Sequence, residues 1–314
     1  KFIMKKITFA GSSKFSHIII KNLLKKNIEI NHVISPLIKI KHKKNSPINE
    51  IITLTKKKNI VFSQCENLSN NETIKLIKNF NPFMILVASY GHIFPKEILN
   101  LPKIGCINIH ASLLPKFRGS SPIQTSLINN DKYTGITIII MNEKIDEGKI
   151  IYKKICKIKY YNTLFHLNIK LAQIASKILI NNINKLYNNK FKQKNQNKNL
   201  ITYAQKIKKI DGLINWKNTA NKINKQIKAY YGWPSSFTFF KSKKIQIIEA
   251  TIYIKNIKYK YGQIIKKNNK GIYVSTIKNI IIIKKLKIEN KKIINTKILN
   301  NTNFFIIGQF LKKM

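Results

Sequence analysis

The sequence predicts an α/β fold with a doubly wound, mostly parallel sheet, followed by a small β-barrel domain. Three observations indicate this. Strand-like and helix-like segments alternate along the first part of the chain, which is the pattern of a parallel sheet covered by helices. A polar stretch then interrupts the chain, and short strand-like runs dominate the remaining residues. At 314 residues, the chain is long enough for two domains that each have their own core.

In the first part of the chain, apolar runs typical of strands alternate with segments of helical periodicity. The clearest helix has Leu164, Leu167, Leu171 and Ile174 at helical spacing. We expect strands at residues 6–10, 29–35, 60–62, 83–88, 106–111, 137–141 and 150–158. We expect helices at residues 15–26, 49–58, 71–79, 123–129 and 163–187.

The composition changes after residue 187. Residues 188–199, NNKFKQKNQNKN, contain one apolar residue among polar and cationic ones, which is typical of a linker. We therefore expect a first domain over residues 1–187, a linker over 188–205 and a second domain over 206–314. In the second domain we expect a helix at 219–230 and strands at 237–240, 244–253, 261–266, 271–275 and 280–286.

The charge of the chain is strongly unbalanced, with 59 Lys and Arg residues against 12 Asp and Glu residues, for a net charge of +47. Such an excess favours a polyanionic partner, because phosphates that lysines neutralise release their counterions. The chain is also rich in Lys, Asn and Ile throughout and holds a single arginine, as a biased nucleotide composition would produce. The charge alone therefore does not establish nucleic-acid binding.

Cysteine content and hydropathy exclude several classes of protein. Cys65, Cys106 and Cys156 are far apart and lack metal-ligand spacing, so we interpret them as small buried hydrophobes in a reducing compartment. The longest apolar runs, such as residues 83–88, are far shorter than the ~20 residues that a membrane helix needs. The opening residues lead directly into a strand and do not resemble a signal peptide. We expect a cytoplasmic protein without a metal site.

Polar side chains stand out in one stretch, Cys106 to Gln124, which reads CINIHASLLPKFRGSSPIQ. Side chains alternate along a strand, so Asn108 and His110 project from the same face. They lie at the carboxyl end of a buried strand, where open α/β sheets bind ligands. Asp146, one of three aspartates in the chain, follows in the loop NEKIDEG. These three residues are the candidate site.

The order NxH, SLLPxxRGxxPIQ, TGITIxxM and IDEG resembles the methionyl-tRNA formyltransferase family, within the folate-dependent formyltransferases. The stretches KITFAGSSKFS and FMILVASYGHIFPKEILNLPKIG resemble the opening strand and the pterin-pocket segment of that family. ITYAQKIKKIDGLINW and AYYGWPSSFTF resemble its carboxy-terminal domain. The resemblance covers most of the chain and is weakest after about residue 255. It implies a Rossmann-like catalytic domain and an OB-like barrel that helps to hold tRNA.

The resemblance implies that Asn108, His110 and Asp146 form the catalytic trio. Asn108 and His110 would donate hydrogen bonds to the formyl oxygen as negative charge develops on it, and one such donor is typically worth ~10²–10³ in rate. Asp146 would accept a hydrogen bond from His110 and steer the amine proton away. The formyl donor would be 10-formyltetrahydrofolate, a co-substrate, and no metal is required. The folate loop would consist of Ser112, Leu113, Leu114 and Pro115, with residues 87–93 at the pterin edge.

Two features are candidates for contact with tRNA. The loop between Pro36 and Pro47 matches in position the insertion with which the family reaches the acceptor end. It is shorter and lacks the expected arginine and glycines, but retains the positive charge of Lys39, Lys41, Lys43 and Lys44. An ordinary solvated loop is the alternative.

Arg118 is the only arginine in the chain, which indicates a role that needs a planar fork of donors. It would either brace its loop or hold a carboxylate or a tRNA phosphate.

We interpret the chain as a monomeric enzyme that formylates methionyl initiator tRNA for translation initiation. Two alternatives remain at this point. The first is a folate-dependent formyltransferase that acts on a small amine, such as a purine precursor or a nucleotide sugar. The second is a basic RNA-binding protein with a degenerate active site.

Overall fold

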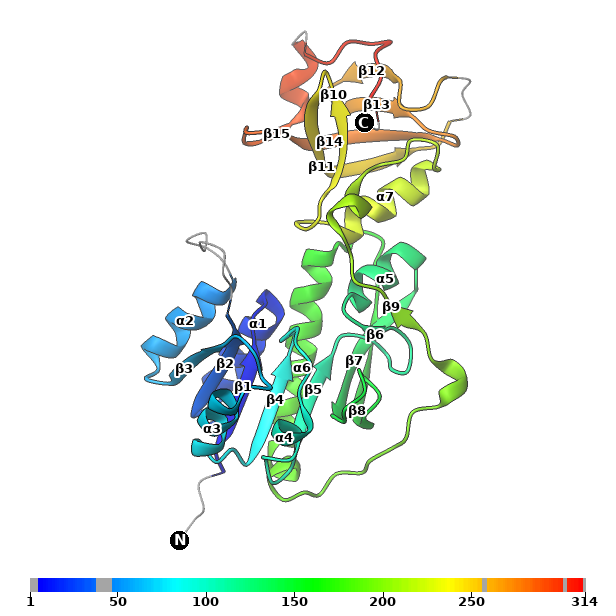
Figure 1. The fold of residues 1–314 in the computed structure, drawn as a ribbon. Coiled ribbons are helices and arrows are strands. Elements are labelled where there is room, and N and C mark those ends of the chain that lie inside the picture. The colour runs from blue at the N-terminus through cyan, green and yellow to red at the C-terminus, as the bar shows by residue number, and fades with distance from the viewer. Residues whose placement is uncertain (1–4, 38–46, 256–258, 302–303, 313–314) are drawn as a thin grey trace. The chain divides into compact units, whose positions relative to one another are not determined.

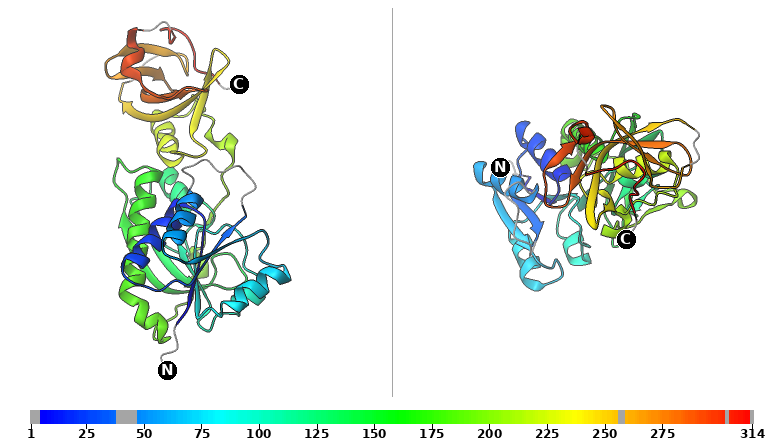
Figure 2. Two further views of the ribbon diagram at one scale, coloured as in Figure 1. Left: turned by 90° about the vertical axis from the view of Figure 1, so that its left-hand side faces the viewer. Right: turned by 90° about the horizontal axis from the view of Figure 1, so that it is seen from above.

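The computed structural model describes residues 5–37, 47–255, 259–301 and 304–312 (Figures 1 and 2). The chain forms two compact units. The first comprises Lys1–Pro122, Lys132–Ile158 and His166–Gln205, and the second comprises Ile123–Asp131, Lys159–Phe165 and Lys206–Met314. Among the described residues, no helix is both long enough and apolar enough to cross a membrane.

The first unit is built on a seven-stranded sheet with the order β3-β2-β1-β4-β5-β7-β8. The pairs from β3 to β5 are parallel, whereas β5–β7 and β7–β8 are antiparallel. This confirms the predicted mostly parallel sheet. The strands are β1 (Ile7–Gly11), β2 (His32–Pro36), β3 (Val61–Cys65), β4 (Met84–Ala88), β5 (Cys106–His110), β7 (Tyr133–Ile140) and β8 (Lys149–Lys157).

Helices cover both faces of this sheet, as a doubly wound fold requires. The chain moves from β1 outward to β3 and then returns to β4, so right-handed crossovers put α1 (Lys14–Lys25) and α2 (Pro47–Lys57) on one face. The same rule puts α3 (Asn71–Asn79) and α4 (Lys96–Leu99) on the other face. There they pack on one apolar cluster with the strands. The long α6 (Leu164–Tyr187) lies beside α1, where Asn22 donates a hydrogen bond to Ser176 at 3.2 Å.

The strand order reverses at β1, which has β2 on one side and β4 on the other. Such a reversal opens a crevice at the carboxyl ends of the two strands, where ligands of α/β sheets bind. Here the Ser12 hydroxyl, after β1, donates to the carbonyl of Ser89, after β4, at 3.2 Å. The two loops that border the crevice are therefore fixed to each other.

The second unit holds an antiparallel sheet with the order β10-β11-β14-β13-β12, with β15 paired to β14. The chain's last described residues hydrogen-bond to both edges, through bridges from Lys312 to Phe239 and from Phe310 to Gln263, and this closes the sheet into a barrel. The elements are α5 (Pro122–Asn129), α7 (Ala220–Ala229), β10 (Ser236–Phe240), β11 (Lys243–Tyr253), β12 (Ile264–Asn268), β13 (Gly271–Ser275), β14 (Ile280–Ile288) and β15 (Ile293–Asn295).

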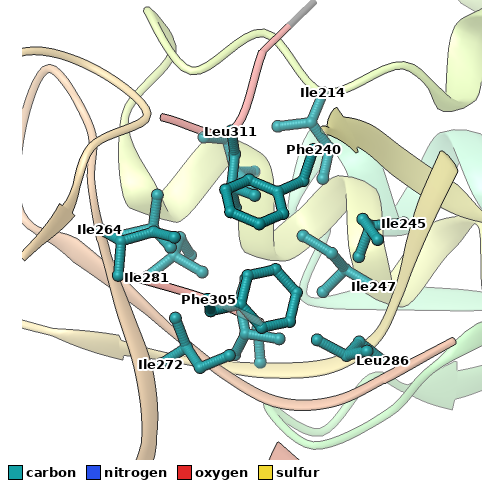
Figure 3. Packing of buried hydrophobic residues seen from close by; sticks show 14 of the residues in the cluster. Ile214, Phe240, Ile245, Ile247, Ile264, Ile272, Ile281, Leu286, Phe305 and Leu311 are labelled. Carbon is teal, nitrogen blue, oxygen red and sulfur yellow. The ribbon is translucent and has the colours of Figure 1, made fainter. Parts of the chain in front are cut away.

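Isoleucine and phenylalanine fill the core of the barrel (Figure 3). Phe240 and Phe305 pack with ring centroids 4.9 Å apart, between isoleucines from four strands. The strand predicted at residues 261–266 begins only at Ile264. The reason is a turn at Gly262, whose φ of +80° suits glycine, and beside which the carbonyl of Leu311 approaches closely.

Three short 3₁₀ helices and one two-stranded sheet complete the described part of the chain. The helices are η1 (Lys198–Leu200), η2 (Lys209–Gly212) and η3 (Thr296–Asn301). In the first unit, β6 (Arg118–Gly119) pairs in parallel with β9 (Tyr203–Ala204). Residues that the composition indicates as a linker are thus hydrogen-bonded to the loop that follows β5.

Candidate active site

The structure brings Asn108, His110 and Asp146 together. Asn108 and His110 project from one face of β5, and both side chains meet the carboxylate of Asp146. The Asn108 amide donates from Nδ2 to Oδ1 of Asp146 at 2.9 Å, and Nδ1 of His110 lies 3.4 Å from Oδ2. The side chains of His110 and Asp146 are only 6% and 10% exposed, so water screens this cluster weakly.

The loop that carries Asp146 reaches the other two residues by folding back. The antiparallel register places Ile140, at the end of β7, opposite Ile107, near the start of β5. The β7–β8 loop must therefore return across the sheet face before Asp146 can contact His110. Gly148 permits this return, because a Cβ atom at that position would collide with the carbonyl oxygen of Ile140.

Asp146 itself has a left-handed backbone, with φ of +52°, which aspartate tolerates better than most residues. Its carboxylate accepts two hydrogen bonds, from Asn108 and from the backbone N–H of Gly119 at 2.8 Å. These contacts aim both carboxylate oxygens at the β5 side chains. The position of the Asp146 carboxylate is thus fixed by two neutral hydrogen-bond donors.

The backbone carbonyl of Phe117 fixes the tautomer of His110. Nε2 of His110 lies 2.8 Å from this oxygen, and a carbonyl only accepts, so Nε2 carries a proton. The sequence predicts a hydrogen bond from His110 to Asp146, and the structure adds this contact with Phe117 at the other ring nitrogen. Nδ1, the other ring nitrogen, faces Asp146.

Arg118 is buried, with 2% exposure, and its guanidinium forms hydrogen bonds with other side chains of the protein. Nε and Nη2 donate to Oε1 of Gln196 at 3.1 and 2.9 Å, and Nη1 donates to Glu147 at 3.2 Å. Both roles that the sequence left open are present here, because the guanidinium braces its loop through Gln196 and also holds the carboxylate of Glu147. All three nitrogens of the planar fork that distinguishes arginine from lysine donate a hydrogen bond.

Gln196 is the residue of this site that sequence reasoning missed. Its Nε2 donates to the backbone carbonyls of Asp146 and Gly148 at 2.7 and 2.9 Å. It lies in the polar segment that the composition indicates as a linker, and no local motif marks it.

The loop predicted to contact folate is fixed to β7. Thr137 accepts from the backbone N–H of Leu114 at 3.0 Å and donates to the carbonyl of Ser112 at 2.7 Å. The Ser112 hydroxyl donates to the Lys116 carbonyl at 2.6 Å. The amine of Lys153 donates to the Leu114 carbonyl, and burial lowers the pKa of this lysine.

These contacts show what each predicted folate residue does within the protein. Ser112, Leu114 and Pro115 are buried, so they shape the loop, whereas Leu113 is half-buried. Leu113 lies against Gly135 of β7, where any Cβ would collide with its side chain.

The segment 87–93 forms the end of β4 and the turn after it. Ser89 and Gly91 have φ of +50° and +90°, and Tyr90 is buried between them. The Tyr90 ring packs on Phe94 with centroids 5.4 Å apart, and burial raises the pKa of its hydroxyl. His92 and Ile93 are exposed at the outer end of the turn.

Two further expectations concern metals and tRNA. In the described part of the chain, no group of three or more His, Cys, Asp or Glu residues could hold a metal ion. The candidate tRNA contacts Lys39, Lys41, Lys43 and Lys44 lie outside the described residues.

Comparison with known proteins identifies the family. The family model "Formyl transferase" matches residues 4–183, and "Formyl transferase, C-terminal domain" matches residues 206–303. The methionyl-tRNA formyltransferase of Blochmanniella floridana is 39% identical over 302 residues, which cover 94% of each chain. That of Thermodesulfovibrio yellowstonii is 36% identical over 292 residues, 93% of this chain and 94% of the relative. The chain belongs to the methionyl-tRNA formyltransferase family.

Solved structures show the same fold in more distant proteins. The sugar 3N-formyl transferase WlaRD has a TM-score of 0.65 at 23% identity, covering 92% of this chain and 99% of its own. HypX from Aquifex aeolicus, solved with tetrahydrofolic acid, has a TM-score of 0.65 at 10% identity and covers 99% of this chain and 51% of its own. At these identities the likeness establishes the architecture alone.

Proposed function

We propose that this chain transfers the formyl group of 10-formyltetrahydrofolate to the α-amino group of methionyl initiator tRNA. The observation that carries the proposal is the convergence of Asn108 and His110 on the carboxylate of Asp146, in a chain of the methionyl-tRNA formyltransferase family. Formyl transfer needs donors for a developing oxyanion and an acceptor for an amine proton. This cluster provides both.

Asn108 supplies the first oxyanion donor. Its amide has two N–H bonds, and Asp146 accepts only one of them. The second is available to the formyl oxygen when the amine attacks the formyl carbon and a C–N bond forms. Since the Asn108 side chain is already oriented by Asp146, no reorganisation is needed at the moment of reaction.

His110 and Asp146 are the groups that donate and accept protons. With Nε2 held by Phe117, a proton on Nδ1 of His110 is directed toward Asp146 and the developing oxyanion. The Asp146 carboxylate accepts the proton that the attacking amine loses, directly or through a water. Cleavage of the bond between the formyl carbon and the folate nitrogen then leaves a nitrogen that takes up one proton, so charge balances over the reaction.

We place the folate co-substrate at the carboxyl ends of β1 and β4, where open α/β sheets bind ligands. The turn 87–93 and the loop 112–115 border the catalytic cluster, and the latter is fixed to Thr137. Rigid backbone next to the cluster suits a planar heterocycle that is recognised through its polar edge. Ser112, Leu113, Leu114 and Pro115 form this folate loop in our proposal.

The positive charge and the barrel unit are proposed to serve tRNA binding. Residues 1–187 carry catalysis, 188–205 connect, and 206–314 bind tRNA together with Lys39, Lys41, Lys43 and Lys44. The enzyme acts as a monomer in the cytoplasm, where initiator tRNA is charged.

Formylation of charged initiator tRNA with 10-formyltetrahydrofolate tests the proposal. Charged elongator tRNA and an amino-sugar nucleotide are the comparison substrates. We expect the initiator to be preferred and its affinity to fall with salt, each neutralised phosphate adding about 0.7–0.9 to the slope of log affinity against log salt. Preference for the amino sugar would instead support the small-amine alternative, and tRNA binding without transfer would support an RNA-binding protein.

A further inference from the structure

The segment from Lys194 to Gln205, which we call the strap, binds both loops of the catalytic cluster. Lys194 exchanges two backbone hydrogen bonds with Ile150, just after the Asp146 loop, at 2.8 and 2.9 Å. At its other end, the Thr202 carbonyl accepts from the Arg118 N–H at 2.9 Å, and the Ala204 carbonyl accepts from Ser120 at 3.2 Å. The strap therefore joins two loops that lie far apart in sequence.

Gln196 lies between these two attachment points of the strap, and both its amide nitrogen and its amide oxygen form hydrogen bonds. Nε2 donates to the carbonyls of Asp146 and Gly148, while Oε1 accepts twice from Arg118. The remaining Arg118 donor reaches Glu147, the neighbour of Asp146. Three consecutive residues of the aspartate loop are thus held by one glutamine–arginine pair.

We propose that Gln196 is a positioning residue, which holds the backbone of Asp146 in its left-handed conformation and thereby aims the carboxylate at Asn108 and His110. The inference rests on the proposed function, and it adds to the formyl-transfer site a residue from outside both catalytic loops. The Arg118 guanidinium holds Gln196 in turn.

The residue type at position 196 follows from this geometry. Two carbonyls on one side require donors, and a buried guanidinium on the other requires an acceptor. Only a side-chain amide offers two N–H donors together with an acceptor oxygen, and asparagine is one methylene shorter. Glutamate would satisfy Arg118 but would turn an acceptor toward the two carbonyls. Lysine would donate to the two carbonyls, but its positive charge would repel the Arg118 guanidinium.

Because Gln196 touches Asp146 through its main chain, its loss should misplace the carboxylate without removing it. Small displacements of a reacting group are costly, and we expect kcat to fall by about 10- to 100-fold in Gln196→Ala. The KM for folate should stay within about threefold, because the folate loop is held by Thr137 and by Thr202 of the strap, and not by Gln196 itself.

The experiment uses the full chain with Gln196→Ala, Gln196→Glu and Gln193→Ala. Gln193 lies one residue before the strap and its side chain is exposed. It is therefore the matched control, and Gln193→Ala should behave as the parent. Gln196→Glu retains the partner of Arg118 and should still lose kcat. Arg118→Lys should lose kcat in the same direction, and combining it with Gln196→Ala should add little, since the two residues act as one unit.

A double variant separates positioning from a general structural role. If Gln196 acts only through Asp146, Gln196→Ala should change the residual rate of Asp146→Asn by less than about twofold. An equal loss in both backgrounds would overturn the proposal. So would a kcat within about threefold of the parent in both single Gln196 variants.

Amide exchange gives a second readout that does not depend on activity. The Gly119 N–H donates to the Asp146 carboxylate, so it reports where that carboxylate points. Its exchange should accelerate in Gln196→Glu but not in Gln193→Ala, while the neighbouring Ser120 N–H, held by Ala204, stays protected. Unchanged exchange at Gly119 would overturn the inference even in an active enzyme. If the parent transferred no formyl group, the proposed function would fail and this exchange would still decide the role of Gln196.

Discussion

Nδ1 of His110 lies 3.4 Å from Oδ2 of Asp146, while Nε2 of the same ring lies 2.8 Å from the Phe117 carbonyl. The Phe117 carbonyl accepts the proton of Nε2, and Nδ1 faces the carboxylate. A ring held at both nitrogens cannot rotate without breaking one contact. The imidazole is therefore held in one orientation between the Phe117 carbonyl and the Asp146 carboxylate.

Removal of either β5 side chain should slow transfer without unfolding the protein. Asn108→Ala and His110→Ala should each lower the single-turnover rate by ~10²–10³, the size expected for an oxyanion donor. Asn181→Ala, an exposed position on α6, is the control and should match the parent. Rates within about tenfold of the parent for both site variants would contradict the assignment.

Asp146→Asn removes the charge of the carboxylate and one of its two acceptor oxygens. Asparagine also tolerates φ of +52°, and its carbonyl oxygen still accepts from Gly119, whereas its NH₂ group replaces the oxygen that accepts from Asn108. We expect a loss in single-turnover rate at least as large as that of His110→Ala, with folate affinity nearly unchanged by calorimetry. A rate close to that of the parent would show that the amine proton leaves by another route.

Thr137→Val tests the attachment of the folate loop. The change is nearly isosteric, but it leaves the buried Leu114 N–H and Ser112 carbonyl without their partner, at a cost of about 1–3 kcal/mol for each group. We expect weaker folate binding with a smaller effect on kcat. Thr238→Val is the matched control, because this fully buried threonine of the barrel also accepts from Trp216 and donates to Lys312. It should lower the melting temperature but leave folate affinity unchanged.

His32 should make stability depend on pH. It is fully buried in β2, stacks on Phe80 with centroids 3.7 Å apart, and contacts Ser63 at 2.9 Å. Burial lowers its pKa from 6.5 to about 4. The unfolded chain therefore binds more protons than the folded one between these two values, so the free energy of unfolding falls as pH decreases through this window.

Between neutral pH and about pH 4, this difference amounts to about 3 kcal/mol for one histidine. Urea unfolding of the parent and of His32→Asn at several pH values measures it. The variant should be less stable at neutral pH, because it loses ring packing, but its stability should depend less on pH. Parallel pH profiles for the two proteins would contradict a buried neutral histidine.

Local sequence patterns were sufficient to predict most helices and strands, though not α4 or β15, and to place Asn108 and His110 on one face of their strand. Asn108 and His110 are two residues apart in an apolar strand, and the alternation of side chains alone puts them on one face. The alternation of strands with helices likewise predicted the parallel part of the sheet, because these periodicities are local. Asp146 and the loop expected to contact folate were predicted from motifs that are contiguous in sequence.

How Asp146 arrives at the site, and what holds it there, depends on long-range contacts that no local pattern encodes. The Asp146 loop starts at the far end of β5 and folds back, which results from the antiparallel register of β5 and β7. Arg118 and Gln196 are 78 residues apart, and the polar composition around Gln196 is the same as that of a solvated linker. Side chains that bond to backbone and side chains that bond to water are of the same types, so composition does not distinguish them. The distinction appears only when β6 and β9 pair and bring the strap onto the catalytic loops.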